Sequence, residues 1–209
     1  MTDQTAGESG PERDAGGVGE SAGTAALGGS PAVVVVCGPP GVGKTTVAGA
    51  AATRLDATVL RTDVVRKELF PEPTYADSET EAVYAELLER SRDHAAAGRS
   101  VVLDGTFRTR SRRGEAVAAA RECGADARLL RVECAESVVR ERIAAREGDA
   151  SDADFEIHRR IRRQFESVDR PHDRIDNSGT TDETERQVAA ALASRPSPPR
   201  PDDSSPPST

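Results

Sequence analysis

Short apolar runs alternate with longer amphipathic segments along most of the chain. The runs occupy residues 33–36, 58–61, 100–104 and 128–134, and a weaker one occupies 172–176. Runs of this length, rich in β-branched residues, are typical of buried strands. Strands that alternate with helices predict parallel βαβ units. We therefore expect an α/β fold, with a five-stranded, mainly parallel sheet that carries helices on both faces.

Apolar spacing, capping residues and glycines set the expected helices between the strands. Val65 and Leu69 stand at i and i+4, as on one face of a helix. Ser78 followed by Glu81 predicts a capping box, and Ser111 is expected to cap the helix after the third strand. The expected helices span residues 45–54, 64–70, 78–97, 111–123, 135–147 and 151–167, with a short one around 188–192.

Composition separates the two ends of the chain from its middle. Residues 1–30 and 194–209 are rich in Gly, Ser, Pro and Asp and have almost no apolar side chains to bury. Such segments cannot offset the entropy lost on ordering, so we expect disordered tails. The folded part is then a single domain over residues 31–193.

Charge and cysteine usage limit the classes of partner and compartment. The net charge of −8 argues against general nucleic-acid binding. No run is long enough to cross a membrane, and the N-terminus does not resemble a signal peptide. Cys37, Cys123 and Cys134 have no metal-type spacing and are expected to be buried free thiols. We therefore expect a cytoplasmic protein, a monomer or a weak dimer.

Residues 38–45 contain the strongest chemical signal in the chain. They read Gly-Pro-Pro-Gly-Val-Gly-Lys-Thr, the G-x-x-x-x-G-K-T spacing of a phosphate-binding loop. Four valines precede the loop and a helical pattern follows it, which disfavours the alternative of an ordinary glycine-rich turn. Backbone amides at the helix N-terminus would bind phosphates, Lys44 would reach the β and γ phosphates of ATP, and Thr45 would bind Mg²⁺. The predicted nucleotide-binding residues are Gly38, Gly41, Val42, Gly43, Lys44, Thr45 and Thr46.

Two aspartates close predicted strands, at the edge where open α/β sheets bind ligands. Asp63 would accept the proton of an attacking hydroxyl, and Arg66, one helical turn on, would hold an anionic part of the substrate. Asp104 follows an uncharged strand, as a Walker B aspartate that holds Mg²⁺ does. The alternatives are that Asp63 only caps a helix and that Asp104 only opens a turn.

Arginines concentrate in two stretches, 108–113 and 140–163. Arg142 and Arg146 are i, i+4 neighbours on one expected helix, and residues 148–152 form a plausible hinge. This pattern predicts a lid over about 140–166 that brings guanidinium groups to the transferred phosphate, with Arg108 on the substrate side. The alternative is ion pairing with neighbouring glutamates, and we expect only two or three of these arginines to contact phosphate.

The blocks Gly-Pro-Pro-Gly-Val-Gly-Lys-Thr-Thr, Thr-Asp-Val-Val-Arg-Lys-Glu-Leu and Val-Val-Leu-Asp-Gly-Thr-Phe resemble small P-loop kinases of the AAA-family ATP-binding type. That family is related to polynucleotide kinases and zeta-type toxins. The resemblance implies a nucleoside-kinase-like domain in which Asp63 is the proton acceptor, Arg66 binds substrate, and Arg142 and Arg146 are catalytic lid arginines. The turn at 176–179 reads Asp-Asn-Ser-Gly, where the family has an Asp-Thr-Ser-Gly-like turn.

Together these features predict a kinase that uses ATP and Mg²⁺ and transfers phosphate to a small-molecule or nucleotide-like acceptor. The alternative is a regulatory ATPase without an acceptor. The chain lacks the Asn-Lys-x-Asp motif of switch GTPases and the Leu-Ser-Gly-Gly signature of transporter ATPases. Nucleic-acid ends are a less favoured acceptor, because aromatic side chains suited to stacking are scarce.

Overall fold

A computed structural model describes residues 29–145 and 151–194. Its sheet has five strands in the order β2–β3–β1–β4–β5, and every pairing is parallel. The expected α/β fold with a five-stranded sheet is confirmed, and "mainly parallel" becomes wholly parallel for the described strands. The strands are β1 (Ala32–Cys37), β2 (Thr58–Arg61), β3 (Val101–Asp104), β4 (Asp126–Glu133) and β5 (Asp173–Asp176).

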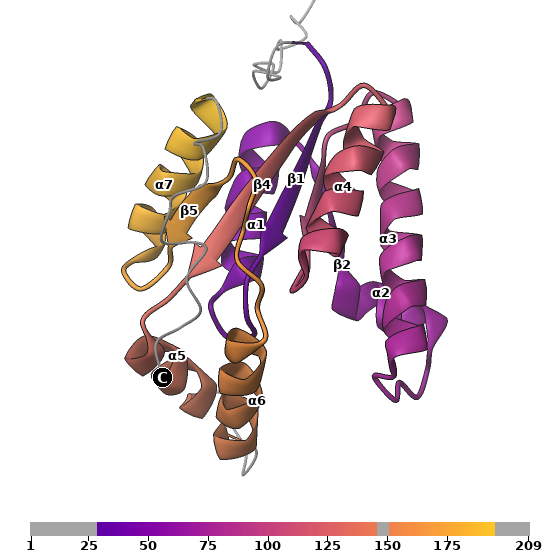
Figure 1. The fold of residues 1–209 in the computed structure, drawn as a ribbon. Coiled ribbons are helices and arrows are strands. Elements are labelled where there is room, and N and C mark those ends of the chain that lie inside the picture. The colour runs from indigo at the N-terminus through magenta and orange to yellow at the C-terminus, as the bar shows by residue number, and fades with distance from the viewer. Residues whose placement is uncertain (1–28, 146–150, 195–209) are drawn as a thin grey trace, which may run out of the picture.

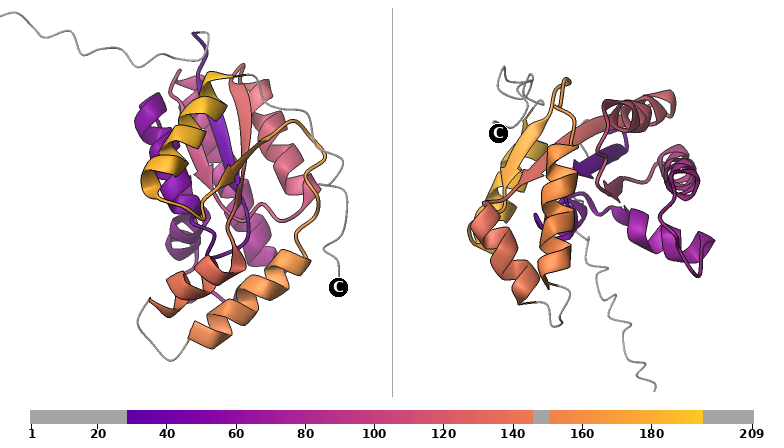
Figure 2. Two further views of the ribbon diagram at one scale, coloured as in Figure 1. Left: turned by 90° about the vertical axis from the view of Figure 1, so that its left-hand side faces the viewer. Right: turned by 60° about the horizontal axis from the view of Figure 1, so that its bottom comes forward.

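Helices cover both faces of this sheet, as Figures 1 and 2 show. On one face, α3 and α4 pack with α2 against Val33 and Val35 of β1, and on the other face α1 and α7 pack against Val34 and Val36. Because both faces are covered, the apolar runs are continuous rather than alternating with polar residues. The helices are α1 (Lys44–Leu55), α2 (Thr62–Leu69), α3 (Asp77–Ala96), α4 (Arg110–Glu122), α5 (Glu136–Ala144), α6 (Ser151–Arg163) and α7 (Thr181–Ala193).

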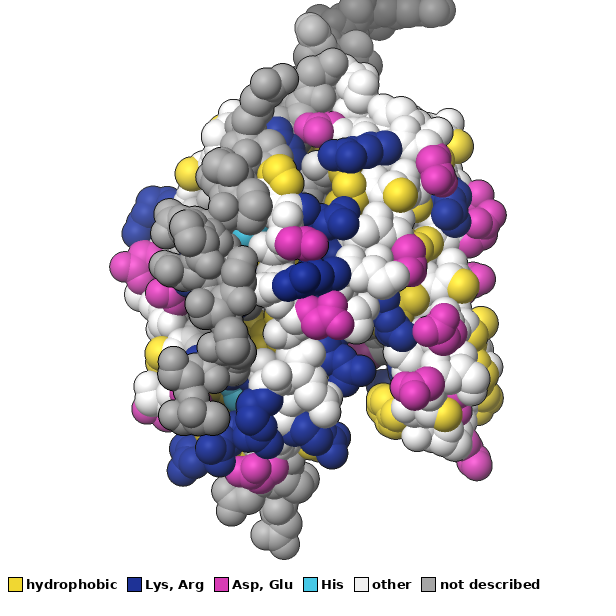
Figure 3. All heavy atoms as spheres, in the orientation of Figure 1, with side chains coloured by type: hydrophobic (Ala, Val, Ile, Leu, Met, Phe, Trp, Pro, Cys, Tyr) yellow, Lys and Arg dark blue, Asp and Glu magenta, His cyan; other side chains and the backbone are white. Residues whose placement is uncertain are grey.

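Two groups of elements project beyond the carboxyl edge of the sheet. In Figure 1, α5 and α6 extend below the sheet on one side, and α2 with the first turns of α3 extends below it on the other. Figure 3 shows an opening between the two projections, with Lys and Arg side chains around it. The loops that follow β1, β2 and β3 all lead into this edge, so it is where a ligand site is expected.

Two of the expected helix caps are wrong. Helix α3 begins at Asp77 after Ala76, so Ser78 lies inside its first turn and no side chain caps the helix. Helix α4 begins at Arg110, and Thr109 rather than Ser111 accepts the amide hydrogen of the third helical residue. In both cases the helix starts one residue earlier than expected, at Asp77 and at Arg110.

The expectations for the cysteines and the tails have mixed outcomes. All three cysteines are free, but only Cys37 is buried, whereas Cys123 and Cys134 are half-buried. Most of the expected tail residues, 1–28 and 195–209, lie outside the described part of the chain. Among the described helices, none combines the length and apolarity that crossing a membrane requires.

Candidate functional site

The loop between β1 and α1 is shaped by glycines that no other residue could replace. Gly43 has φ +86°, and a Cβ there would lie 1.9 Å from Nδ2 of Asn177. A Cβ on Gly38 would lie 2.6 Å from the carbonyl oxygen of Val132. The loop is therefore pressed against β4 and the turn after β5, and its path needs residues without side chains.

Lys44 and Thr45 extend from this loop at the start of α1. The Lys44 ammonium donates a hydrogen bond to the Pro39 carbonyl at 2.9 Å, so it folds back over the loop. Burial lowers the pKa of Lys44, and the nearby Asp104 carboxylate opposes that shift. The Thr45 hydroxyl donates to Oδ2 of Asp104 at 2.8 Å. Two oxygen atoms of the kind that Mg²⁺ prefers are thus adjacent at the end of β3.

Asp63 and Asp104 are joined by a residue that the sequence analysis did not select, Arg61. The register of β2 on β3 places Arg61 beside Asp104, and Asp63 follows two residues later at the start of α2. Arg61 Nη2 lies 2.8 Å from Asp63 Oδ2, and its Nε lies 3.7 Å from Asp104 Oδ2. Asp104 is buried, whereas the Asp63 side chain is 57% exposed. The position of Arg61 at a strand end, next to Asp63, is the signal that would have found it.

Asn177, in the turn after β5, contacts the loop from the edge of the sheet opposite β2. Its Nδ2 donates to the Val42 carbonyl at 2.9 Å, its Oδ1 accepts from the Thr184 hydroxyl at 2.8 Å, and it is buried. This is the position at which the chain departs from the family's turn. The carboxamide makes both contacts at once, so the departure has a clear structural use.

Two polar side chains of the helices expected to form the lid lie against the loop. A guanidinium nitrogen of Arg142 lies 3.5 Å from the position of a Cβ on Gly43 and donates to the Cys134 sulfur at 3.6 Å. The buried His158 on α6 shares a 2.6 Å hydrogen bond with the Pro40 carbonyl. His158 was missed, since a single histidine in an arginine-rich helix has no distinctive spacing. Arg146 lies outside the described residues.

Two of the four arginines of α6 are engaged with glutamates, as the alternative of ion pairing predicted. Arg159 and Arg162 form ion pairs with Glu136 of α5, and Arg159 also pairs with Glu156. Arg140 of α5 stacks on the Phe155 ring at 4.4 Å. These contacts bind α5 and α6 to each other, so the two helices form a single projecting unit.

The two arginines expected on the substrate side differ in their surroundings. Arg108 is exposed and donates to the side chain of Gln164 at 2.7 Å. Arg66 is buried and donates to Glu79 and Thr80 at 3.4 and 3.1 Å. Arg66 therefore ties α2 to α3, and its binding of substrate stays a prediction.

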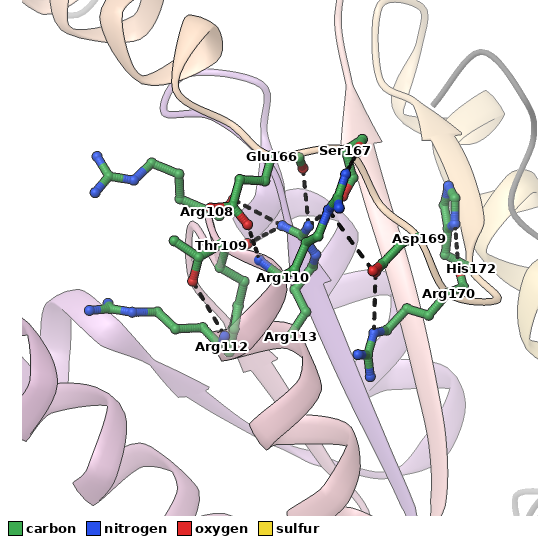
Figure 4. Close-up of polar contacts among 11 residues, drawn as sticks. Arg108, Thr109, Arg110, Arg112, Arg113, Glu166, Ser167, Asp169, Arg170 and His172 are labelled. Atoms are coloured by element: carbon green, nitrogen blue, oxygen red, sulfur yellow. Dashed lines mark hydrogen bonds and ion pairs between the residues drawn. The ribbon is translucent and has the colours of Figure 1, made fainter. Parts of the chain in front are cut away.

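Arg113, in the same cluster as Arg108, has a purely internal position. Its guanidinium donates to the carbonyls of Phe107 and Arg108, at 2.8 and 3.0 Å, and to those of Glu166 and Ser167, at 3.0 and 2.8 Å. Figure 4 shows how these bonds join the loop after β3 to the chain that leaves α6. Burial lowers the pKa of Arg113. This arginine holds two loops together and does not face the opening.

Solved structures with a similar fold include several kinases. A sugar kinase from Janibacter sp. HTCC2649 matches with a TM-score of 0.61 and 19% identity, covering 84% of this chain and 99% of that one. A gluconokinase from Sinorhizobium meliloti 1021 matches at 0.58 and 21%, covering 79% and 93%. The APS kinase of Mycobacterium tuberculosis, solved with AMPPNP and APS, matches at 0.60 and 19%, covering 79% and 99%. The fold is that of the P-loop kinases, and with its phosphate-binding loop it indicates a nucleotide-binding domain.

The chain belongs to the AAA domain family (AAA_33), whose model matches residues 33–168. It is also similar to the Mycobacterium tuberculosis protein named "Uncharacterized protein Rv2004c" and to Mb2027c of Mycobacterium bovis. Each is 36% identical over 175 residues, which cover 76% of this chain and 34% of the relative. The chain thus spans about a third of the length of these relatives. The kinship with polynucleotide kinases and zeta-type toxins stays a prediction.

Proposed function

We propose that the protein is an ATP-dependent phosphotransferase that moves the γ-phosphoryl group of ATP to a hydroxyl of a small-molecule or nucleotide-like acceptor. One arrangement carries the proposal. The phosphate-binding loop contacts Asp104 through Thr45, and Arg61 links Asp104 to the exposed Asp63. A nucleotide site and a carboxylate open to a second substrate therefore lie side by side.

On the nucleotide side, the amides of residues 42–46 and the Lys44 ammonium neutralise the phosphates. The hydroxyl of Thr45 and the carboxylate of Asp104 fit Mg²⁺, which is usually held by one or two protein oxygens together with phosphates and water. No cluster of three acidic, histidine or cysteine ligands occurs in residues 29–145 and 151–194, which suits such a sparse site. When bound, Mg²⁺ supplies charge stabilisation to the phosphates.

On the acceptor side, Asp63 takes the proton of the attacking hydroxyl. The hydroxyl oxygen forms a bond to the γ phosphorus, the bond from that phosphorus to the bridging oxygen breaks, and ADP leaves. The exposed carboxylate is accessible to a second substrate, and Arg61 at 2.8 Å orients it. Arg66 and Arg108 are proposed to contact the acceptor or its phosphorylated product.

The lid of this proposal spans about residues 140–166 of a domain over 31–193, and helices α5 and α6 supply its described part. Arg142 lies beside the loop and is proposed to stabilise charge on the transferred group, with Arg146 in the same role. His158 links the lid to the Pro40 carbonyl of the loop. A lid of this kind would exclude water from the transferred phosphoryl group.

An ATP-consumption screen against sugars, sugar acids, alcohols, nucleosides and oligonucleotides tests the function. We expect at least one class to increase ADP release, and Asp63→Asn to lower that acceptor-dependent rate by roughly 100-fold or more while ATP binding persists. Asp93→Asn, at an exposed aspartate in the last turn of α3, is the matched control and should change nothing.

Two results would count against this proposal. ATP turnover that never depends on an acceptor would favour a regulatory ATPase. Normal transfer by Asp63→Asn with a genuine acceptor would remove Asp63 from the role of proton acceptor.

A further inference from the structure

Tyr75, in the connection between α2 and α3, is the most exposed large hydrophobic residue in the described part of the chain. Its relative exposure is 71%, against 42% or less for Val64, Leu69 and Ile157. The chain's other tyrosine, Tyr84, is buried, and its hydroxyl accepts the Phe107 amide hydrogen. An aromatic ring left in solvent forgoes the stabilisation that burial would give it, so its position calls for an explanation.

The backbone that carries Tyr75 is held by a dedicated set of hydrogen bonds. Tyr75 has φ +60°, a left-handed conformation that a bulky residue rarely adopts. The Glu79 carboxylate accepts from the Tyr75 amide at 2.8 Å, from the Thr74 amide at 3.0 Å and from the Thr74 hydroxyl at 2.7 Å. Strain of this kind persists only where surrounding contacts enforce it. The ring is therefore held outward rather than left loose.

A buried cation supports one face of the ring. The Arg66 guanidinium carbon lies 4.9 Å from the Tyr75 ring centroid, and its nitrogens are tied to Glu79 and Thr80. Glu79 thus fixes both the backbone of Tyr75 and the cation behind its ring. One face of the ring is occupied by protein, and the exposure of the residue leaves the rest open.

This aromatic surface lies on the acceptor side of the proposed reaction. Arg66 is one helical turn from Asp63 on α2, which places the two side chains about 5–6 Å apart at their Cβ atoms. In Figure 1 the connection between α2 and α3 lies across the opening from α6. Val64 and Leu69, also on α2, add exposed apolar surface to the same projection.

We propose that Tyr75 is the surface on which the acceptor stacks, and that the acceptor carries a flat, unsaturated ring near its reactive hydroxyl. The inference rests on the proposed function and narrows its substrate class. A fixed aromatic ring loses little conformational freedom on binding, so it suits recognition of a flat partner. Besides its proposed contact with the acceptor, Arg66 supports the ring.

Tyrosine NMR tests the contact without requiring turnover. The chain has two tyrosines and no tryptophan, so protein labelled with ¹³C only at tyrosine ring carbons gives signals from Tyr75 and Tyr84 alone. Tyr75→Phe assigns them, and the buried Tyr84 is an internal control. With the nucleotide site saturated by Mg²⁺ and AMPPNP, two matched pairs are titrated: phenyl against methyl β-D-glucopyranoside, and adenosine against ribose.

We expect the ring-bearing member of at least one pair to shift the Tyr75 signal. It should bind roughly tenfold more tightly than its ringless partner, because that affinity ratio corresponds to the loss of one stacking contact. The Tyr84 signal should stay in place. If no ring-bearing probe shifts Tyr75, or ringless probes shift it equally, the proposal is wrong. A Tyr75 signal that changes with protein concentration alone would instead indicate contact between copies of the chain and would also overturn it.

Kinetics with the acceptor found by screening separate this inference from the kinase proposal. Tyr75→Ala should raise the acceptor KM roughly tenfold and leave kcat and the KM for ATP within about twofold, and Tyr75→Phe should restore the acceptor KM. An unchanged acceptor KM in Tyr75→Ala would overturn the stacking role while leaving the kinase intact. Stacking seen by NMR with no transfer to any acceptor would support the stacking role and overturn the kinase proposal.

Discussion

The phosphate-binding loop and the acceptor side lie at the same edge of the sheet but are held in place in different ways. The loop is fixed by Asp104, His158 and Asn177, which are 59, 118 and 135 residues from their partners in sequence. The acceptor side is built from local contacts, such as Arg61 to Asp63 and Glu79 to Tyr75, separated by two and four residues. The loop is thus assembled by the whole fold, whereas the part of the acceptor side in residues 61–80 is held largely by contacts within that short stretch.

This difference suits two substrates, one of which always has the same geometry while the other can differ. A triphosphate presents the same geometry in every turnover, and a loop held from several elements is preorganised to receive it. A locally built, exposed segment can vary in sequence without disturbing the core, as binding loops generally do. Changes on the two sides should therefore have separable effects on nucleotide binding and on the local structure around Tyr75.

The largest expected effect is at Lys44. Lys44→Ala removes the ammonium group that folds over the loop, and we expect ATP affinity to fall by roughly 100-fold or more, because the phosphates lose this side-chain cation. Isothermal titration calorimetry with AMPPNP measures it. Lys67→Ala removes the chain's other lysine, exposed on α2, and should leave affinity unchanged. Similar losses in both variants would mean that the loop does not bind the phosphates.

Asn177 tests whether the loop depends on distant contacts. Asn177→Ala leaves the Val42 carbonyl without its side-chain donor, and the Thr184 hydroxyl keeps only the Thr180 carbonyl, which should cost about 2 kcal/mol of unfolding free energy. We also expect weaker ATP binding, measured beside urea unfolding. Asn177→Asp keeps the acceptor for Thr184 but cannot donate to Val42, so it should lose ATP affinity more than stability. Full ATP affinity in both variants would show that the loop is rigid without Asn177.

Alkaline pH should act on the nucleotide side through Cys37, at the end of β1. Burial raises the pKa of the Cys37 thiol from 9.0 to about 11. The folded state therefore favours the thiol, and the associated stability is present below pH 9 and is lost as pH rises toward 11. We expect the free energy of unfolding to fall by about 2 kcal/mol by pH 11. Cys37→Ala should reduce this slope and the half-buried Cys123→Ala should keep it in full; equal slopes in the two variants would contradict the assignment.

Acidic pH should act first on the acceptor side, with the smallest effect. Hydrogen bonds from the Thr74 amide and hydroxyl and from the Tyr75 amide lower the pKa of Glu79. The stability that the ionised carboxylate adds to the folded state is therefore present above its unfolded pKa and is lost as pH falls through the lowered value. We expect the Tyr75 NMR signal to move toward that of a mobile tyrosine at acid pH before the Tyr84 signal changes. Glu79→Gln should show the altered Tyr75 signal already at neutral pH, with ATP affinity intact. Simultaneous changes at both tyrosines would mean that the two sides are not separable.

The sequence predicted those parts of the fold in which a type of residue can take only one structural role. The four valines of β1 have to be buried, and the alternation of strands with helices leads to a parallel sheet. The contacts of Arg113 and Arg108 could not be told apart in advance. Both belong to one basic cluster, yet one guanidinium is enclosed by four carbonyls and the other is exposed. Which arginine is buried depends on where residues 166–167 pass, and that is set by packing far along the chain.

The sequence alone therefore determined the strand–loop–helix unit at 33–55 and the presence of strand-end aspartates, because glycine spacing and apolar runs act over a few residues. Tertiary structure decided what surrounds them. The register of β2 on β3 placed Arg61 between Asp63 and Asp104, and the turn after β5 brought Asn177 to Val42. Packing of α2 on α3 put Arg66 behind Tyr75. Contacts of this kind depend on the relative positions of whole elements, which no local pattern specifies.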